Sequence, residues 1–298
     1  MGHDHHHYNH HHHHATGNLR VAFLLNLIFT IIEIIGGVLT NSLAILSDAL
    51  HDLGDSLSLG LSWYFQRLSQ RGKTDLFSYG FKRFSLLGAI INSLVLFAGS
   101  VIILIHAIPR LWQPETTDAR GMLWLSILGI IINGAAVLRL RRGHSINEKV
   151  ISLHLLEDVL GWVAVLVGSI LMMYFDWPWI DPLLSLLISV YILSSVFKNL
   201  KESLIIILQG TPTGINMEEV RRLIIEIDQV VDIHDCHAWS MDGEYNVLTV
   251  HLVLDRNYDL TEQARIKRKV HDRLAHMPMH HTTIAFETKD ERSEQIDC

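Results

Sequence analysis

The sequence predicts an α-helical membrane protein with six transmembrane helices, followed by a small soluble α+β domain. Three observations support this fold class. The 298-residue chain is 49% hydrophobic and only 18% charged, with a mean hydropathy of +0.26, which is too apolar for an ordinary soluble protein of this length. The first two thirds of the chain contain six apolar runs. From Thr211 onward, polar and apolar residues alternate as they do in soluble domains.

The N-terminal segment, residues 1–18, is expected to be a disordered cytosolic tail rich in histidine. Nine of the 20 histidines of the chain fall between His3 and His14. Imidazoles separated by small polar residues cannot form a packed core, but they can bind metal ions. The tail is therefore predicted to collect zinc weakly, or to lend a ligand to a neighbouring copy of the chain.

Six runs are predicted to cross the membrane, because each approaches the ~20 apolar residues that a hydrocarbon core of ~30 Å requires. Within a membrane domain of residues 19–208, the expected spans are residues 19–39, 42–66, 84–111, 122–138, 150–175 and 182–197. Turn-forming residues separate them. Pro109 and Pro114 end the third span, and Asp181-Pro182 precedes the sixth.

The positive charges of the short loops predict the orientation of these spans, because lysine and arginine accumulate on the cytosolic side. One side holds Arg20, Arg67, Arg71, Lys73, Lys82, Arg83, Arg139, Arg141, Arg142, Lys149, Lys198 and Lys201, whereas the other holds Arg110 and Arg120. Both termini are therefore predicted to be cytosolic. We expect a multi-pass integral membrane protein embedded in the lipid bilayer, in the cell (inner) membrane if the source is prokaryotic.

Two spans carry the same motif, His-x-x-x-Asp, where ionisable side chains are costly to bury. The second span contains His51 and Asp55, and the fifth contains His154 and Asp158. Residues four apart lie about 40° apart around a helix axis, so each pair shares one helix face. Two such faces provide two imidazoles and two carboxylates, which suits tetrahedral zinc. The alternative is two separate His–Asp hydrogen bonds that only stabilise helix packing, but the repetition of the motif favours metal.

Other acidic residues of the spans lie outside the paired motifs. Asp48 lies one turn before His51 and is predicted to act as a base or proton carrier beside the metal, with a solvated cavity wall as the alternative. Glu33 could line the same aqueous route or neutralise a nearby cation. Asp52 and Glu157 lie off the two ligand faces, so neither is expected to be a ligand.

These features together resemble the cation diffusion facilitators, a family of zinc and related metal exporters. The resemblance includes the six spans, the His-rich N terminus, the paired motifs and a C-terminal domain with His-Asp-x-His-x-Trp at residues 234–239. It implies that His51, Asp55, His154 and Asp158 form the transport site, and that two histidines with two aspartates prefer zinc. It also implies a homodimer that exports Zn²⁺, with Cd²⁺ and Co²⁺ as further candidates, in exchange for protons.

The loop between the second and third spans departs from the pattern of this family. Some members bind a second metal there through an aspartate and two histidines around a Ser-aromatic-Gly turn. Residues 75–81 of this chain read Asp-Leu-Phe-Ser-Tyr-Gly-Phe, with phenylalanines at the histidine positions. No metal is predicted in this loop.

The C-terminal domain, residues 209–289, precedes a tail of residues 290–298 and resembles the family's metallochaperone-like α+β fold. We predict helices at residues 217–228 and 261–277, and strands at residues 231–240, 244–254 and 282–288. Asp242-Gly243 predicts a two-residue hairpin turn. If Met241 faces Glu244 across this turn, His234 faces His251.

These two facing histidines begin a second predicted metal site, for Zn²⁺ as a regulatory ion. By resemblance to relatives, His280 and Glu287 supply its remaining ligands, and His281 could replace His280. The alternative is a group of ordinary surface histidines on a dimerising domain. Strand alternation places Cys236 on the same face as the first histidine and His237 on the opposite face.

An intramembrane enzyme and a passive channel or metal sensor are the competing functions. Catalytic zinc usually keeps one open position, whereas the four predicted ligands close the shell. The sequence contains neither His-Glu-x-x-His nor Gly-x-Ser-x-Gly. We therefore expect neither an enzyme nor a nucleic-acid partner. A channel or a sensor would use the same residues as an exporter, so only coupled transport separates these functions.

Overall fold

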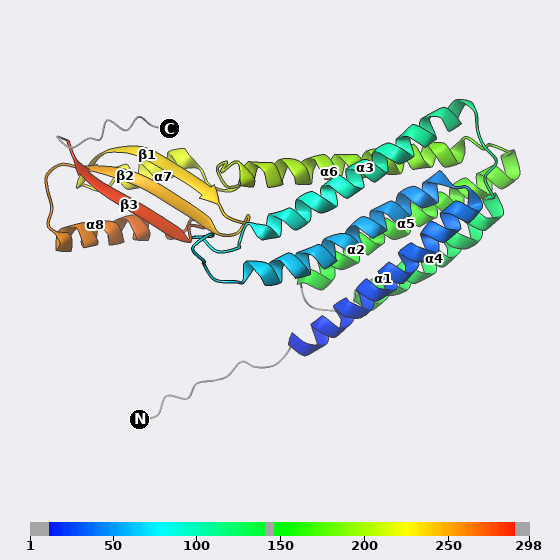
Figure 1. The fold of residues 1–298 in the computed structure, drawn as a ribbon, viewed down its shortest axis with the longest axis horizontal. Helices are drawn as coiled ribbons and strands as arrows, with labels where there is room; N and C mark the ends of the chain where they lie inside the picture. The colour runs from blue at the N-terminus through cyan, green and yellow to red at the C-terminus, as the bar shows by residue number, and fades with distance from the viewer. Residues whose placement is uncertain (1–11, 141–145, 290–298) are drawn as a thin grey trace, which may run out of the picture. The chain divides into compact units, whose positions relative to one another are not determined.

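A computed structural model describes residues 12–140 and 146–289, which belong to two compact units (Figure 1). The first unit contains residues 12–61, 91–140 and 146–198, and therefore most of the membrane helices. The second contains residues 62–90 and 199–289. It contains the loop between the second and third helices, the adjoining helix ends and the C-terminal domain.

Six helices form the membrane domain within the described residues. They are α1 (His12–Thr40), α2 (Leu43–Ser69), α3 (Phe84–Trp112), α4 (Ala119–Leu140), α5 (Ile146–Phe175) and α6 (Ile180–Ile207) (Figure 1). In the described part of the chain, α3 to α6 each contain an apolar stretch long enough to cross a membrane, and α1 contains a shorter one. The aspartates of α2 lower its apolar character. The predicted α-helical membrane fold is confirmed.

The first helix begins earlier than predicted. Residues 12–18 were expected to belong to the disordered tail, but α1 starts at His12. Extending an existing helix adds one hydrogen bond for each residue fixed, so a long apolar helix can continue into a polar flank. The rest of the predicted tail, residues 1–11, lies outside the described residues, as do residues 290–298.

Small residues allow α4 to lie close to both α1 and α5. A Cβ atom on Gly129 of α4 would collide with the indole of Trp162 on α5. Trp162 is fully buried, and it packs in a cluster with Phe29 and Met122. Asp158 lies one turn before Trp162, so this packing orients the face of α5 that was predicted to bind metal.

The start of α2 is held by a buried carboxylate from α6. Asp181 accepts hydrogen bonds from the Ser42 hydroxyl at 2.6 Å, from the Leu43 amide at 2.9 Å and from the Ala44 amide at 3.2 Å. It therefore caps α2 from another helix, because the first amides of a helix lack partners within it. This anchor fixes the axial position of the His-x-x-x-Asp motif farther along α2.

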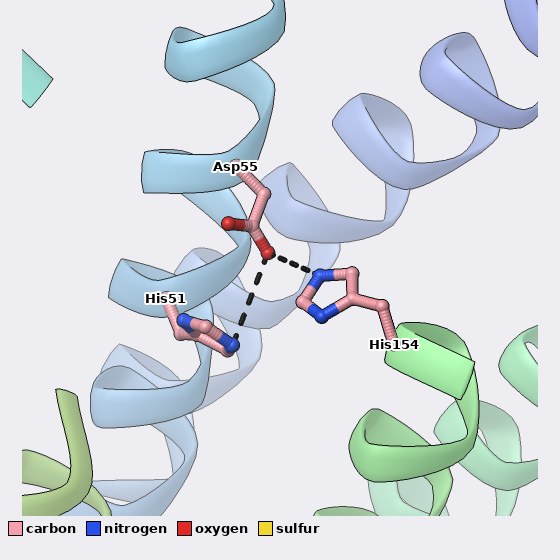
Figure 2. A group of neighbouring side chains, drawn as sticks. All are labelled: His51, Asp55 and His154. Atoms are coloured by element: carbon pink, nitrogen blue, oxygen red, sulfur yellow. Dashed lines mark hydrogen bonds and ion pairs between the residues drawn. The ribbon is translucent and has the colours of Figure 1, made fainter. Parts of the chain in front are cut away.

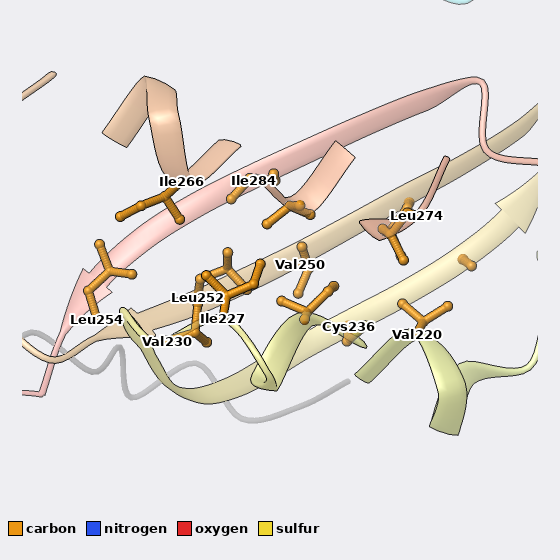
Figure 3. Close-up of a cluster of buried hydrophobic side chains, with 14 of the residues drawn as sticks. Val220, Ile227, Val230, Cys236, Val250, Leu252, Leu254, Ile266, Leu274 and Ile284 are labelled. Atoms are coloured by element: carbon orange, nitrogen blue, oxygen red, sulfur yellow. The ribbon is translucent and has the colours of Figure 1, made fainter. Parts of the chain in front are cut away.

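The C-terminal domain is a three-stranded sheet in the order β1-β2-β3, covered on one face by two helices. The strands are β1 (Val230–Ser240), β2 (Asn246–Leu254) and β3 (His281–Thr288), and the helices are α7 (Met217–Ile225) and α8 (Leu260–Arg273). β2 pairs antiparallel with β1 and parallel with β3. Side chains such as Val220, Ile266 and Leu252 form the core between helices and sheet (Figure 3). The predicted α+β fold is confirmed.

The hairpin between β1 and β2 differs from the predicted one, yet it joins the predicted histidines. Ser240 pairs with Asn246, so the turn contains residues 241–245 rather than two residues. A register shift between His234 and His237 offsets the longer turn, and His234 still faces His251. The longer turn shifts the register of the strands by one residue, and the irregularity between His234 and His237 shifts it back. The pairing of His234 with His251 is therefore the predicted one.

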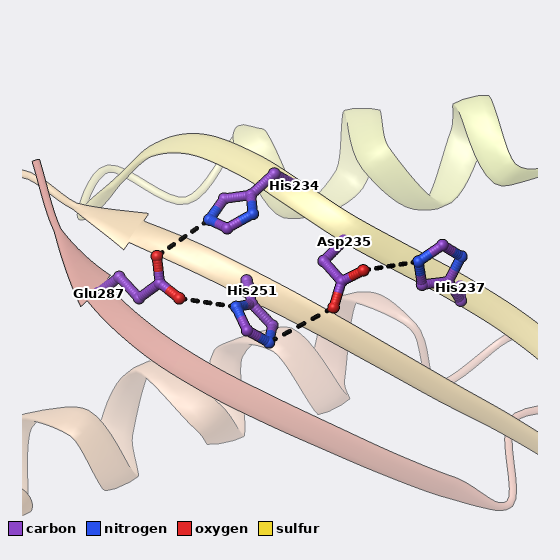
Figure 4. A network of polar contacts seen from close by, with 5 residues as sticks. All are labelled: His234, Asp235, His237, His251 and Glu287. Carbon is purple, nitrogen blue, oxygen red and sulfur yellow. Dashed lines mark hydrogen bonds and ion pairs between the residues drawn. The ribbon is translucent and has the colours of Figure 1, made fainter. Parts of the chain in front are cut away.

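The register shift also changes which side chains share a face of the sheet. Asp235 lies at the shift and has a left-handed backbone with φ of 47°. Beyond it, Cys236 packs in the core under the helices, and His237 turns to the face that carries His234 (Figure 4). This is the reverse of the predicted alternation, because a bulge inserts one extra residue into the strand.

Candidate metal centres

The structure brings His51 and Asp55 of α2 together with His154 of α5 (Figure 2). His154 Nε2 lies 2.7 Å from Asp55 Oδ2, and His51 Nε2 lies 3.8 Å from the same oxygen. The two imidazole rings are 5.7 Å apart. All three side chains are partly exposed, so the group is accessible as well as clustered. Two helices thus direct two imidazoles and one carboxylate to one point, as a zinc ligand set requires.

Asp158, the fourth predicted ligand, lies outside this group of three. Its side chain is buried, and it interacts electrostatically with both histidines of the group. Zinc would need its carboxylate oxygen at ~2.0 to 2.2 Å. The structure therefore gathers three of the four predicted ligands and leaves the fourth nearby.

The other acidic residues of the spans occupy different surroundings. Asp48 and Asp52 of α2 and Glu33 of α1 are buried. Glu157 is exposed, and it accepts a hydrogen bond of 3.3 Å from the Tyr191 hydroxyl on α6. The Tyr191 ring lies 6.4 Å from the His51 ring. Sequence patterns do not point to this tyrosine, because a single tyrosine in an apolar span forms no motif.

A second group lies on the face of the sheet opposite the helices and contains His234, His251 and Glu287 (Figure 4). The Glu287 carboxylate accepts from His234 Nε2 at 3.0 Å and from His251 Nδ1 at 2.7 Å. One residue comes from each of the three strands, so the sheet register fixes their spacing. Three of the predicted ligands are therefore close enough to hold one ion.

Asp235 and His237 extend this group along β1. Asp235 Oδ1 lies 2.7 Å from His237 Nε2, and Asp235 Oδ2 lies 3.6 Å from His251 Nε2. Neither residue was predicted to take part, because regular strand alternation points His237 away. The bulge brings both side chains to the face of the histidines, and the sequence alone gave no sign of it.

The structure does not bring His280 or His281 to this group, contrary to the prediction. β3 runs from His281 to Thr288, and Glu287 lies near its far end. Six or seven residues of strand span about 20 Å. The His280 ring stacks on Tyr245 at 5.2 Å, and its Nδ1 accepts from the Asn246 amide at 3.2 Å. His280 therefore contacts the β1–β2 turn and its neighbouring strand.

Phenylalanines occupy the loop positions at which some family members carry histidines. The ring of Phe77 packs against those of Phe81 and Phe84, at 4.8 and 5.5 Å. Asp75 of the same loop is exposed. The aromatic side chains thus contribute packing to the loop, and the expectation that this loop binds no metal stays a prediction.

Comparisons with known proteins agree with this architecture. Residues 19–208 match the cation efflux transmembrane domain, and residues 212–289 match the cytoplasmic domain of cation efflux proteins. The two matched regions contain both groups of clustered histidines and carboxylates.

Several bacterial proteins are similar to nearly the whole chain. A cadmium, cobalt and zinc/H⁺-K⁺ antiporter of Bacillus subtilis is 35% identical over 97% of this chain and 93% of its own length. The metal cation efflux system protein CzcD of Cupriavidus metallidurans is 34% identical over 91% and 86%. The zinc transporter ZitB of Escherichia coli is 30% identical over 96% and 91%. Since both domain matches and these relatives agree over almost its full length, the chain belongs to the cation efflux family of membrane transporters.

Proposed function

We propose that this protein exports Zn²⁺ from the cytosol in exchange for protons, with Cd²⁺ and Co²⁺ as further substrates. The observation that carries the proposal is the group of His51, Asp55 and His154 between two membrane helices. Zinc favours a mixture of imidazole and carboxylate ligands, whereas harder ions favour oxygen alone. Relatives whose names specify zinc, cadmium and cobalt support the same range of substrates.

The geometry of this group suits an ion that binds and leaves. One oxygen of Asp55 lies close to both imidazoles, so the three ligands are clustered. Approach of the Asp158 carboxylate would complete a set of four ligands. A histidine nitrogen binds either a proton or a metal ion, so the two cations compete for the same atoms. An acidic outer compartment would therefore favour release of zinc, and a less acidic cytosol would favour reloading.

The cytosolic group is proposed to hold a regulatory zinc ion in a homodimer whose termini are both cytosolic. His234, His251 and Glu287 provide three ligands, and a structural zinc site takes four. A histidine from the His-rich tail of the partner protomer could supply the fourth. The charge distribution of the loops supports cytosolic termini, and a prokaryotic source would place the protein in the cell membrane.

Purified protein in sealed liposomes tests the transport function. Zinc, cadmium, cobalt and manganese are supplied outside, a fixed pH gradient is imposed, and metal uptake is measured together with proton movement. We expect gradient-dependent uptake of zinc with opposite proton flow, and its loss in Asp55→Ala. Asp176→Asn, which removes the charge of an exposed carboxylate between α5 and α6 and is compatible with the left-handed backbone there, is the matched control. Zinc uptake that ignores the gradient would indicate a channel.

A further inference from the structure

Three carboxyl groups lie buried together in the membrane domain without the partners that such groups normally have. Glu33 of α1 is fully buried, and Asp52 and Asp48 of α2 are 2% and 6% exposed. Both oxygens of Glu33, and Oδ2 of each aspartate, lack any hydrogen-bond partner among the described residues. The carboxyl group of Glu33 adjoins that of Asp52 and interacts electrostatically with that of Asp48.

The charged groups that face Glu33 are all acidic. They are Asp48 and Asp52 from α2 and Asp158 from α5, with no basic group among those that act on it in the described part of the chain. Negative charge in a low-dielectric interior is unstable unless a cation compensates it. The arrangement therefore requires either protons on these groups or a bound cation among them.

A buried carboxylate with a structural role accepts hydrogen bonds from the groups that it holds, as another carboxylate of the same domain shows. Asp181 is as deeply buried as Glu33, but it accepts three hydrogen bonds from the start of α2. Its burial is therefore explained by helix capping. Among the described residues, Glu33 has no such bond from a hydroxyl group or a backbone amide, and the group that adjoins its oxygens is the carboxyl of Asp52. Buried acceptors without partners indicate a site for something that the protein chain itself does not supply.

We propose that Glu33 and Asp48 form a second cation position, which binds the monovalent counter-cation, a proton or an alkali-metal ion, that moves against the transition metal. This inference rests on the proposed function. The position offers oxygen atoms and no imidazole, so it favours hard cations over zinc. Glu33 belongs to α1, whereas the predicted metal ligands belong to α2 and α5.

The position also explains how the two cations could exclude each other. Asp48 lies three residues before His51 on α2, so the carboxyl position and the metal group share one helix. A divalent ion at the metal group repels a cation held nearby in a medium of low dielectric constant. Occupation of one position therefore disfavours occupation of the other, and exchange of the cations follows.

The test separates coupled transport from movement of zinc itself. Glu33→Gln keeps the size of the side chain and removes its charge. Two rates are measured with the full chain in liposomes: zinc uptake driven by a cation gradient, and exchange of labelled for unlabelled zinc at equal concentrations without a gradient. We expect driven uptake to fall at least about tenfold and exchange to stay within about twofold of wild type. Glu202→Gln, an exposed carboxylate of α6, should change neither rate.

Separate gradients identify the counter-cation. A pH gradient at equal potassium and a potassium gradient at equal pH are imposed in turn. The counter-cation is the ion whose gradient drives zinc uptake by wild type but not by Glu33→Gln. Normal driven uptake by Glu33→Gln overturns the proposal. Loss of exchange in a monodisperse variant that still binds zinc also overturns it, because Glu33 would then belong to the path of the metal.

A second variant keeps the test decisive if Glu33→Gln does not fold. Asp48→Asn removes another carboxylate of the same position and should give the same split between driven uptake and exchange. Unchanged driven uptake in this variant overturns the proposal. Wild-type protein that shows neither driven uptake nor exchange would overturn the proposed transport function, and the counter-cation position with it.

Discussion

The two metal-binding groups of this chain contain similar side chains but differ in how fully those side chains are engaged. In the cytosolic group, Glu287 uses one oxygen for each histidine, and the side chain of His234 is 9% exposed. In the membrane group, one oxygen of Asp55 faces both histidines, and the side chain of His154 is 39% exposed. The first arrangement is suited to retaining an ion, and the second is suited to passing one on.

The scaffolds explain this difference. Backbone hydrogen bonds fix the register of the three strands, so their ligands keep their spacing without metal. Helices carry no such bonds between them, and packed helices can shift relative to each other by small sliding movements. A site shared by two helices can therefore open and close, whereas a site shared by three strands cannot readily do so.

The largest effect is expected from removing the carboxylate on which the membrane group converges. Asp55→Ala takes away the oxygen that both imidazoles approach, so zinc transport in liposomes should fall by more than about 100-fold. His154→Ala should have a similar effect. Both variants should remain folded dimers by size-exclusion chromatography, as should the Asp176→Asn control. Normal transport by either variant would show that the group is not the transport site.

Exchanging one imidazole of the same group for a carboxylate should change selectivity more than rate. His51→Asp replaces a nitrogen ligand by oxygen, so preference should broaden from zinc toward harder or larger ions. It also removes one atom at which proton and metal compete, so the pH dependence of flux should weaken. Zinc and cadmium fluxes measured against pH compare the variant with wild type. Identical profiles with unchanged preference would exclude this histidine from coupling.

Many features of the two metal-binding groups could be predicted from the sequence, because they depend on the spacing of residues along the chain. Apolar runs of sufficient length predicted the six helices, and the spacing of four residues placed each histidine on one helix face with its aspartate. The strands of the C-terminal domain and the pairing of His234 with His251 also agree with the structure.

The remaining features depend on contacts that sequence spacing does not encode. The bulge at Asp235 offsets a longer turn, so the predicted pairing of His234 with His251 is right. The predicted side of the sheet for His237 is wrong, because the bulge turns this residue to the face of His234 (Figure 4). Tyr191 reaches the membrane group only through helix packing. The surroundings of Glu33 likewise arise from α2 and α5, far away in the sequence. Such neighbours are set by tertiary structure, which a single sequence does not reveal.

A smaller effect on transport, but a clear one on binding, is expected in the cytosolic group. Glu287→Gln removes the charge that faces both histidines, so the affinity of this group for zinc should fall about 10- to 100-fold. The maximal transport rate should change little. Zinc titration of the full chain by calorimetry measures the affinity.

His280→Ala is the matched control for that titration. His280 stacks on Tyr245, away from the group, so its loss should leave zinc affinity nearly unchanged. A loss of affinity as large as that of Glu287→Gln would restore His280 as a ligand, as the family resemblance predicts.

The smallest effect is expected from the His-rich segment, whose residues 1–11 lie outside the described part of the chain. Deleting residues 2–14 removes all nine of its imidazoles and leaves α1 from Ala15 onward. A tethered weak binder raises the local concentration of its ligand without changing the later steps. The apparent KM for zinc should therefore rise about three- to tenfold, with the maximal rate nearly intact. Replacing the nine histidines by asparagine keeps the length of the segment, and should reproduce this change if the imidazoles cause it. A large fall in maximal rate at unchanged KM would instead mean that the segment takes part in the transport cycle itself.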